Sequence, residues 1–255
     1  MSILYTNAIL SVRSSVLLNP DRIRRMIAAG SDKDAQDILM ECKWSLDTIN
    51  IFETERQKTL DEFNKLCPDP NLAEIINAKS SFDADGNTDL KLIQNYYDAQ
   101  FKRLKKLKNK FITDFFVAQI DLLNLRTFAK VRSMGGRPEN LFIDGGKITE
   151  SECQEVFRRN PHNIKSAIAN MDYSDLLDKL VDGLEGGILT EFENASNQYL
   201  INLARKDGDD SFKLNPIFHW FISKTEEIRI AKTIIMGKKF GKTRDAIREE
   251  LRGVI

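Results

Sequence analysis

The chain has 255 residues, of which 42% are hydrophobic and 30% charged, and this composition is typical of a folded soluble protein that needs no disulfide or metal to hold its core. Its 38 basic and 38 acidic side chains cancel, so it lacks the basic excess that marks most nucleic-acid-binding proteins. No membrane-spanning stretch, signal peptide or close pair of cysteines is visible, and together these features predict a cytoplasmic location.

Helical periodicity recurs along the chain and predicts an all-α fold. Leu, Ile, Lys, Glu, Asp and Ala are abundant, whereas only 7 residues are Val, and no alternation of apolar and polar residues is long enough to indicate a strand. We expect repeated antiparallel helical bundles in three domains. These are an N-terminal helical domain (1–85), a middle helical repeat (86–172) and a C-terminal helical repeat (173–255).

Several helix starts are marked by capping residues. Asn19-Pro20, Asn160-Pro161 and Asn215-Pro216 each place a capping side chain before a proline at the first helical position. Ser31 and Asp34 have the spacing of a capping box. We therefore expect helices to begin directly after each of these caps.

Residues 83–89 resemble the start of a calcium-binding loop, with oxygen ligands at alternate positions from Asp83 to Asp89. However, Thr88 stands where such loops have glycine, and Gln94 stands where they have a bidentate glutamate. We expect a solvated loop that caps the next helix, with a calcium-responsive module as the alternative.

The clearest helical segment lies between Gly86 and Gly135, where 48 consecutive residues contain neither Gly nor Pro. Apolar side chains from Ile93 to Phe115 follow one another at steps of three or four, which keeps them on one face of a helix. An unbroken helix of this length would extend roughly 70 Å. The segment is therefore either one long spine or two helices with a bend at Asn109 or Asn124.

The same segment contains the single basic run of the chain. Its members are Lys102, Arg103, Lys105, Lys106, Lys108 and Lys110. The favoured interpretation is a solvated helix face, and the alternative is a contact with acidic lipid headgroups or an acidic partner.

Two glycine pairs occur in matching contexts, Asp144-Gly145-Gly146 and Glu185-Gly186-Gly187. Each is followed by a Thr and, three residues later, by a Glu, which is the spacing of a capping box. The caps would be Thr149 with Glu152 and Thr190 with Glu193. We favour two helix–turn–helix corners over a pair of phosphate-cradling turns, because helix initiation accounts for every residue.

A second internal sequence repeat pairs Asn124-Leu125-Arg126 with Glu227-Ile228-Arg229. Met134-Gly135 follows the first and Met236-Gly237 the second, and an acidic residue, Asp121 or Glu226, lies on the preceding turn. Such repetition predicts helical units that bury faces against one another. We interpret the acidic residue and the arginine as a buried or half-buried ion pair that fixes helix register.

Other segments imitate chemical sites without completing them. Residues 237–243 resemble a Walker A loop but have three residues between the glycines where four are required, and a helical segment precedes them where a strand should be. We expect Gly241 to form a turn and Thr243 to cap the last helix. His162 and His219 have no ligand spacing and no nucleophile nearby. The sequence predicts no catalytic residue, metal site or cofactor.

From about residue 89 to residue 251 the chain resembles the C subunit of the V/A-type ATP synthases, the relative of the d subunit of the eukaryotic V-ATPase. Within this segment the resemblance rests on three stretches: residues 121–135, the Asp144-Gly145-Gly146 turn, and the closing stretch from Asn215 to Leu251. The opening Tyr5-Thr6-Asn7-Ala8 with Arg13 also resembles the start of the family, so four motifs occur in the expected order. The matching positions, which we expect to be structural, are Asp121, Asn124, Arg126, Arg132, Gly135, Glu226, Glu227, Arg229 and Gly237. Residues 44–81 carry no match.

The resemblance implies a funnel- or wedge-shaped helical protein without an active site. Members of the family act as a socket between the rotating central shaft and the membrane rotor ring of an ATPase or ATP synthase that transports protons or sodium ions. The chain would then be one monomer of a hetero-oligomeric complex, peripheral on the cytoplasmic face of the membrane, without membrane insertion or nucleic-acid binding. Its candidate partner contacts are Lys102, Lys105, Lys106, Lys108, Arg244 and Arg248. The alternatives are a free-standing helical scaffold or a nucleotide- or calcium-binding protein.

Overall fold

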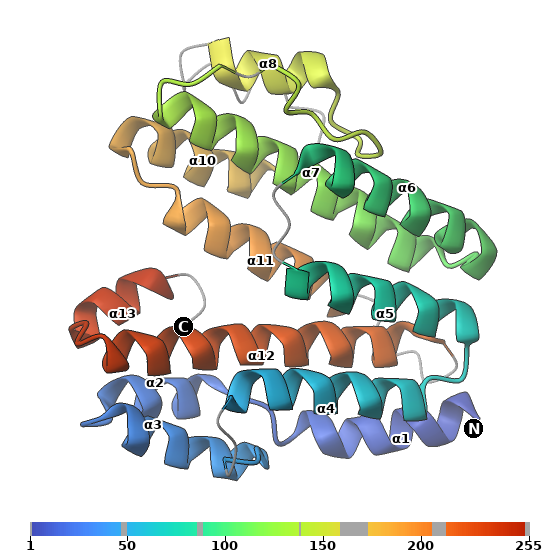
Figure 1. Ribbon diagram of the computed structural model, residues 1–255, viewed down its shortest axis with the longest axis vertical. Helices are drawn as coiled ribbons and strands as arrows, with labels where there is room; N and C mark the ends of the chain where they lie inside the picture. The colour runs from blue at the N-terminus through green and yellow to red at the C-terminus, as the bar shows by residue number, and fades with distance from the viewer. Residues whose placement is uncertain are drawn as a thin grey trace. The chain divides into compact units, whose positions relative to one another are not determined.

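A computed structural model describes residues 2–46, 50–85, 89–137, 139–158, 173–205 and 213–252. Within these ranges every regular element is a helix, which confirms the all-α fold (Figure 1). Asn160-Pro161 and His162 lie outside the described residues.

The described helices range from short to long. In chain order they are α1 (Ile3–Ser14), α2 (Pro20–Ala28), α3 (Asp32–Leu39), the 3-10 helix η1 (Met40–Cys42), α4 (Ile51–Leu66), α5 (Pro70–Asp85), α6 (Leu90–Leu107), α7 (Lys110–Ser133), α8 (Glu150–Arg158), α10 (Ser174–Gly186), α11 (Thr190–Arg205), α12 (Asn215–Lys239) and α13 (Arg244–Glu250).

The chain forms two compact units. Unit 1 combines Met1–Asn77 with Ala204–Ile255, and unit 2 is the continuous segment Ala78–Leu203. The division into three domains at 1–85, 86–172 and 173–255 stays a prediction.

Unit 1 is built around α12, which contacts α1, α2, α3, α4 and α13 (Figure 1). Its core joins apolar side chains of these helices, including Met26, Leu39, Ile234, Ile235 and Ile247, all at most 2% exposed. Because both ends of the described chain supply this core, its packing depends on residues far apart in sequence.

Unit 2 is built around α7, which contacts α6, α8 and α10. Leu125 and Phe128 of α7 are fully buried beside Leu177 and Leu180 of α10 and Phe192 of α11. Each long helix therefore serves as the central element of one unit.

The segment between Gly86 and Gly135 is two helices and not a spine. The bend lies at Asn109, since α6 ends at Leu107 and Lys108 adopts the left-handed conformation with φ 53°. Asn109 then caps α7 by accepting a hydrogen bond from Ile112 N–H at 3.1 Å. Asn124, the other candidate, lies inside α7.

Most predicted caps are present. Asn19 accepts from Arg22 N–H at 2.8 Å, and Ser31 and Asp34 form the reciprocal bonds of a capping box. Asn215, by contrast, is the first residue of α12, and the residue that flanks the helix is Leu214.

The two glycine corners differ at their caps. Thr149 and Glu152 form a capping box, with Glu152 N–H donating to Thr149 Oγ1 and Thr149 N–H donating to Glu152 Oε2. At the second corner α11 begins at Thr190 itself, one position earlier than a Thr190 cap would place it, and the Glu193 carboxylate pairs with Lys130 of α7 at 2.5 Å.

Candidate functional site

A buried aspartate in the middle of α7 holds a loop. Asp121 is fully buried and accepts hydrogen bonds from Ile148 N–H at 2.8 Å and from the Tyr173 hydroxyl at 2.9 Å. Burial raises the pKa of Asp121, and these hydrogen bonds oppose the rise only in part. A Cβ atom at Gly146 would lie 2.1 Å from Asp121 Oδ1, and Gly145 takes φ 111°. Close approach therefore requires the second glycine of the turn, and backbone conformation requires the first.

One turn later, Asn124 holds the same loop. Its amide nitrogen donates to Ile143 C=O at 2.8 Å and its amide oxygen accepts from Ile143 N–H at 3.0 Å. Arg126 is exposed, and within the described residues it forms no ion pair with Asp121. The predicted ion pair in this repeat is therefore wrong, because Asp121 and Asn124 satisfy backbone groups of the 143–148 loop instead.

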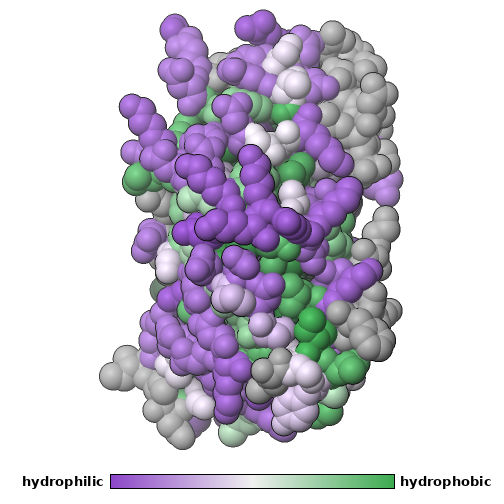
Figure 2. All heavy atoms as spheres, turned by 90° about the vertical axis from the view of Figure 1, so that its right-hand side faces the viewer, coloured by the Kyte–Doolittle hydropathy of each residue, from purple (hydrophilic) through white to green (hydrophobic). Residues whose placement is uncertain are grey.

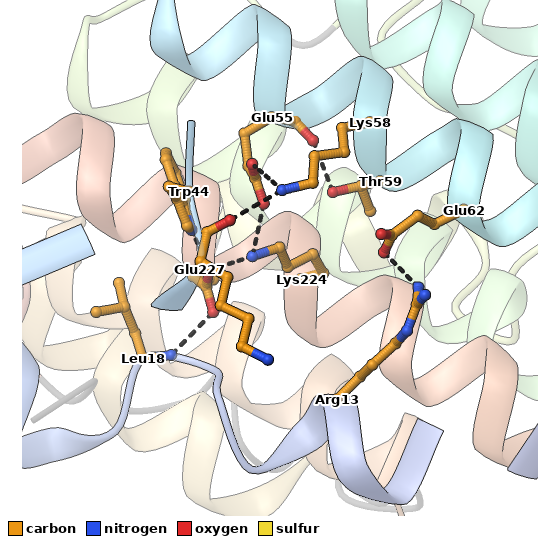
Figure 3. Close-up of polar contacts among 10 residues, drawn as sticks. Arg13, Leu18, Trp44, Glu55, Lys58, Thr59, Glu62, Lys224 and Glu227 are labelled. Carbon is orange, nitrogen blue, oxygen red and sulfur yellow. Dashed lines mark hydrogen bonds and ion pairs between the residues drawn. The ribbon is translucent and has the colours of Figure 1, made fainter. Parts of the chain in front are cut away.

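A second buried acid lies in the middle of α12 (Figure 3). Glu227 is 3% exposed and accepts from Leu18 N–H at 2.8 Å and from Trp44 Nε1 at 2.6 Å. It also accepts from Lys224 Nζ, one turn earlier on the same helix, at 2.5 Å. A single carboxylate thus joins α12 to the segment before α2 and to the segment after η1.

Lys224 links this acid to α4 (Figure 3). Its ammonium lies 2.8 Å from Glu55 and 5.2 Å from the centre of the Trp44 ring, and its side chain is only 9% exposed. Burial alone would lower the pKa of Lys224, but the nearby charges of Glu227 and Glu55 outweigh it and raise that pKa. Lys224 therefore carries its charge at neutral pH.

The cluster formed by Glu55, Lys224 and Glu227 is unevenly charged, since two buried carboxylates share one buried ammonium. Glu55 Oε2 is buried with no hydrogen-bond partner, and Lys58 Nζ approaches Glu55 only to 3.6 Å. Sequence analysis singled out Glu227 but missed Glu55, Lys224 and Trp44. The signal that could have found Lys224 is its place three residues before Glu227 on the same helix, whereas Glu55 and Trp44 carry no comparable signal.

The first helix is joined to the same unit by polar contacts. Arg13 pairs with Glu62 of α4 at 2.5 Å, and Thr6 Oγ1 donates to Leu66 C=O at 2.9 Å (Figure 3 shows the first pair). Asn7 donates from its amide nitrogen to Lys213 C=O at 3.3 Å. Three residues of the opening motif thus anchor α1 to α4 and to the start of α12.

Asp121 and Glu227 occupy the same register of their helices. Each lies twelve residues before the end of its helix, Asp121 before Ser133 and Glu227 before Lys239. Each accepts a backbone hydrogen bond from the residue before a helix cap, Ile148 before Thr149 and Leu18 before Asn19. The helices that follow, α8 and α2, both have 9 residues.

The ends of the two long helices confirm this register. Gly135 N–H donates to Arg132 C=O and Gly136 N–H to Val131 C=O, which is a Schellman motif. Gly241 and the following residue repeat it, donating to Lys238 C=O and Gly237 C=O at 2.9 Å. The sequence comparison paired Gly135 with Gly237. The hydrogen bonds at the helix ends show instead that the counterpart of Gly135 is Gly241.

Gly237 and Glu226 have local roles on α12. A Cβ at Gly237 would lie 2.9 Å from Ile247 Cγ1, so this glycine permits close packing of α13. Glu226 accepts from Arg229 Nε at 2.8 Å and from its Nη2 at 2.6 Å. In this repeat the predicted half-buried ion pair is present.

The segment resembling a Walker A loop is a helix end followed by a cap. Gly241 takes φ 72°, and Thr243 accepts from Ala246 N–H at 3.2 Å, as predicted. Lys238 donates to Ile27 C=O and Ala29 C=O at the end of α2, and Lys242 pairs with Glu250. These lysines serve contacts within the protein.

The segment resembling a calcium loop is divided between two helices. Asp83 lies in α5 and pairs with Lys79 at 2.8 Å, whereas Asp89 caps α6 by accepting from Lys91 N–H at 2.8 Å. Gln94 accepts from Asp144 N–H at 2.8 Å, and residues 86–88 lie outside the described residues. The part of the chain that the structure describes contains no group of three or more His, Cys, Asp or Glu side chains able to hold a metal ion.

The predicted contact residues lie on the surface. Lys102, Lys105, Lys106 and Lys108 are exposed near the turn between α6 and α7, and Arg244 and Arg248 are exposed on α13. Arg248 pairs with Asp245 at 3.1 Å. His219 is half-buried and its Nε2 lies 3.1 Å from Ser223 Oγ. Among the described helices, none is both long and apolar enough to cross a bilayer.

Comparison with known proteins identifies the family of this chain. The family model described as "ATP synthase (C/AC39) subunit" matches residues 23–250. The chain belongs to this family.

The A-type ATP synthase C subunit of Haloquadratum walsbyi is 24% identical over 141 residues, which are 54% of this chain and 41% of that protein. The corresponding proteins of Halorubrum lacusprofundi and Halobacterium salinarum are 26% and 25% identical over 141 and 142 residues, covering 54% of this chain and 40% of each relative. The aligned part thus spans about two-fifths of the length of these relatives.

Proposed function

We propose that the chain is a non-catalytic adaptor of a V/A-type rotary ATPase or ATP synthase, joining the rotating central shaft to the membrane rotor ring. The observation that carries this proposal is the family match over residues 23–250. In this role the chain transmits torque in a complex that couples ATP to proton or sodium-ion transport, on the cytoplasmic face of the membrane. ATP hydrolysis or synthesis is left to other subunits.

The internal contacts support a mechanical role. Close-packed helices are stiff and transmit strain. In both units a buried acid in the central helix, Asp121 or Glu227, holds the backbone of a distant segment. We propose that these units are structural repeats, that the assembled protein is funnel- or wedge-shaped, and that the family-motif residues serve packing instead of chemistry.

Co-purification with the rotary complex tests the proposal. An affinity-tagged chain produced in its native cells should isolate shaft and rotor-ring subunits, and its deletion should separate the soluble ATPase from the membrane. The protein alone should not turn over ATP. Isolation of the tagged chain without these subunits, from cells that assemble an intact rotary complex, would contradict the adaptor role.

The exposed basic residues are the proposed partner contacts. They are Lys102, Lys105, Lys106, Lys108, Arg244 and Arg248. Charge reversal of Lys105, Lys106 and Lys108 to Glu should lower the yield of intact complex, because docking through several charges weakens when their sign is inverted. An unchanged yield would remove these residues from the contact.

Ligand titrations separate this proposal from its alternatives. A nucleotide-binding protein built on residues 237–243 would bind ATP with Mg²⁺, and a calcium-responsive module built on residues 83–89 would change its melting temperature with Ca²⁺. We expect neither effect, because Lys238 and Lys242 bind protein groups and Asp83 pairs with Lys79. A free-standing scaffold would also be inert, but it would not isolate rotary subunits.

A further inference from the structure

Positive charge is concentrated at one turn of a protein whose overall charge is zero. Residues 102–110 contain six basic and no acidic side chains, whereas the whole chain has 38 of each. Lys110 pairs with Asp114, but no described residue forms an ion pair with Lys102, Lys105, Lys106 or Lys108. We call these four exposed side chains the lysine face. Figure 2, which looks onto the edge of unit 2 where α6 turns into α7, shows mainly hydrophilic side chains there.

Helix stability explains only part of this run. Lys105 and Lys106 lie in the last turn of α6, where positive charge is favoured by the helix dipole. Lys108 takes a left-handed conformation that glycine or asparagine would adopt more easily, and Lys110 opens α7, where positive charge is disfavoured. Lysines placed against local preference indicate a requirement beyond folding.

The chemistry of the face distinguishes between two anionic partners. Protein interfaces are depleted in lysine and enriched in arginine and aromatic residues, which supply their binding energy. Here the exposed cations are lysines, with Arg103 half-buried among them, Leu104 is 2% exposed, and no large apolar side chain between 102 and 110 is prominently exposed. Clusters of four to eight basic residues on a helix are typical of attraction to anionic lipids, which needs charge without shape complementarity.

We propose that the lysine face binds anionic lipid headgroups at a bilayer surface. The proposal narrows the contact of these four lysines to lipid and leaves Arg244 and Arg248 as candidate contacts with protein subunits. It rests on the proposed function only in that it names what this part of the surface meets when the chain sits beside a membrane sector. Each lysine close to an anionic membrane raises the affinity about fivefold. The face would hold the outer edge of unit 2 near the membrane without inserting any segment into it.

Vesicle co-sedimentation of the full chain tests this directly. We expect binding to phosphatidylcholine vesicles that contain phosphatidylglycerol, no binding to pure phosphatidylcholine, and loss of binding as salt screens the charges. The variant Lys102→Gln/Lys105→Gln/Lys106→Gln/Lys108→Gln keeps helix-forming side chains and should bind at least ~30-fold more weakly. The same four positions changed to Arg should retain binding, because the charge is kept.

A matched control removes equal charge elsewhere. Lys33→Gln/Lys65→Gln/Lys91→Gln/Lys232→Gln changes four exposed lysines spread over α3, α4, α6 and α12, and it should bind vesicles within a fewfold of the parent chain. Equal losses in both variants would overturn the proposal, as would absence of binding to anionic vesicles. Binding to polyglutamate without binding to vesicles would also overturn it and indicate an acidic protein partner. None of these failures alters co-purification with rotary subunits, so the adaptor role is judged separately.

Discussion

Asp121 of α7 and Glu227 of α12 are held by the same two kinds of donor. Each accepts one hydrogen bond from the backbone of a residue that precedes a helix cap and one from an aromatic side chain, Tyr173 for Asp121 and Trp44 for Glu227. They differ in their charge partners, because only Glu227 has a buried lysine beside it. Burial is therefore the main influence on the pKa of Asp121, whereas Glu227 belongs to an ionic network with Lys224 and Glu55.

Removing the Asp121 carboxylate should destabilise unit 2. In Asp121→Ala, the buried Ile148 N–H and the Tyr173 hydroxyl lose their acceptor, at a cost of about 1–3 kcal/mol for each group. Chemical denaturation followed by circular dichroism would measure the loss. A loss below ~0.5 kcal/mol would show that the loop is held by other contacts.

Asp121→Asn should change the pH dependence of stability. Because the pKa of Asp121 is raised in the folded protein, its contribution is fully present below the unfolded pKa of about 4 and is lost as pH rises through the folded pKa. The variant cannot titrate at this position, so its stability relative to the parent chain should improve as pH rises. Denaturation curves between mildly acidic and neutral pH would measure this, and a constant difference would contradict it.

Lys224→Met should cost about 3–5 kcal/mol, because it leaves the buried carboxylates of Glu55 and Glu227 without their ammonium. Adding Glu55→Gln should recover part of the loss by removing one uncompensated charge, while Glu227 keeps its donors Leu18 N–H and Trp44 Nε1. The half-exposed Lys58 is the control, and Lys58→Met should cost less than ~1 kcal/mol. Equal effects of the two lysine variants in urea unfolding would refute the network.

Gly146→Ala should destabilise the protein by about 1–3 kcal/mol, because the added methyl group would overlap Asp121 Oδ1. Gly186, at the end of α10, has no atom within 4 Å of such a methyl group. Gly186→Ala should therefore stay within ~0.5 kcal/mol of the parent chain. Thermal unfolding of both variants measures the contrast, and similar melting temperatures would count against the close approach.

The three cysteines should be unreactive in the folded protein. Burial raises the pKa of Cys42 and Cys67 to about 11 and that of Cys153 to about 12, so almost no thiolate exists near neutral pH. Labelling with a thiol reagent should be slow until denaturant is added, when all three react. Rapid labelling of a native thiol would contradict this and show that the structure around that thiol opens locally.

Local patterns in the sequence predicted local structure well. Periodicity predicted the helices, and the caps at Asn19, Ser31, Thr149 and Thr243 followed from side chains that satisfy the nearest free N–H groups. The site was harder, because Asp121 and Asn124 bind backbone atoms of a loop, and a backbone atom leaves no mark in the sequence. Glu55 and Lys224 meet only through the packing of α4 on α12, which no short motif encodes.

Unit 1 is assembled from two distant stretches of the chain, and this limits when it can fold during synthesis. Helices α2, α3 and α4 leave the ribosome well before α12, the helix that covers their apolar faces. Unit 2, being continuous, can fold during translation, whereas the first helices of unit 1 must remain unfolded or protected until α12 is synthesised. A chain truncated before α12 and released from the ribosome should therefore contain a folded unit 2 beside a protease-sensitive N-terminal segment.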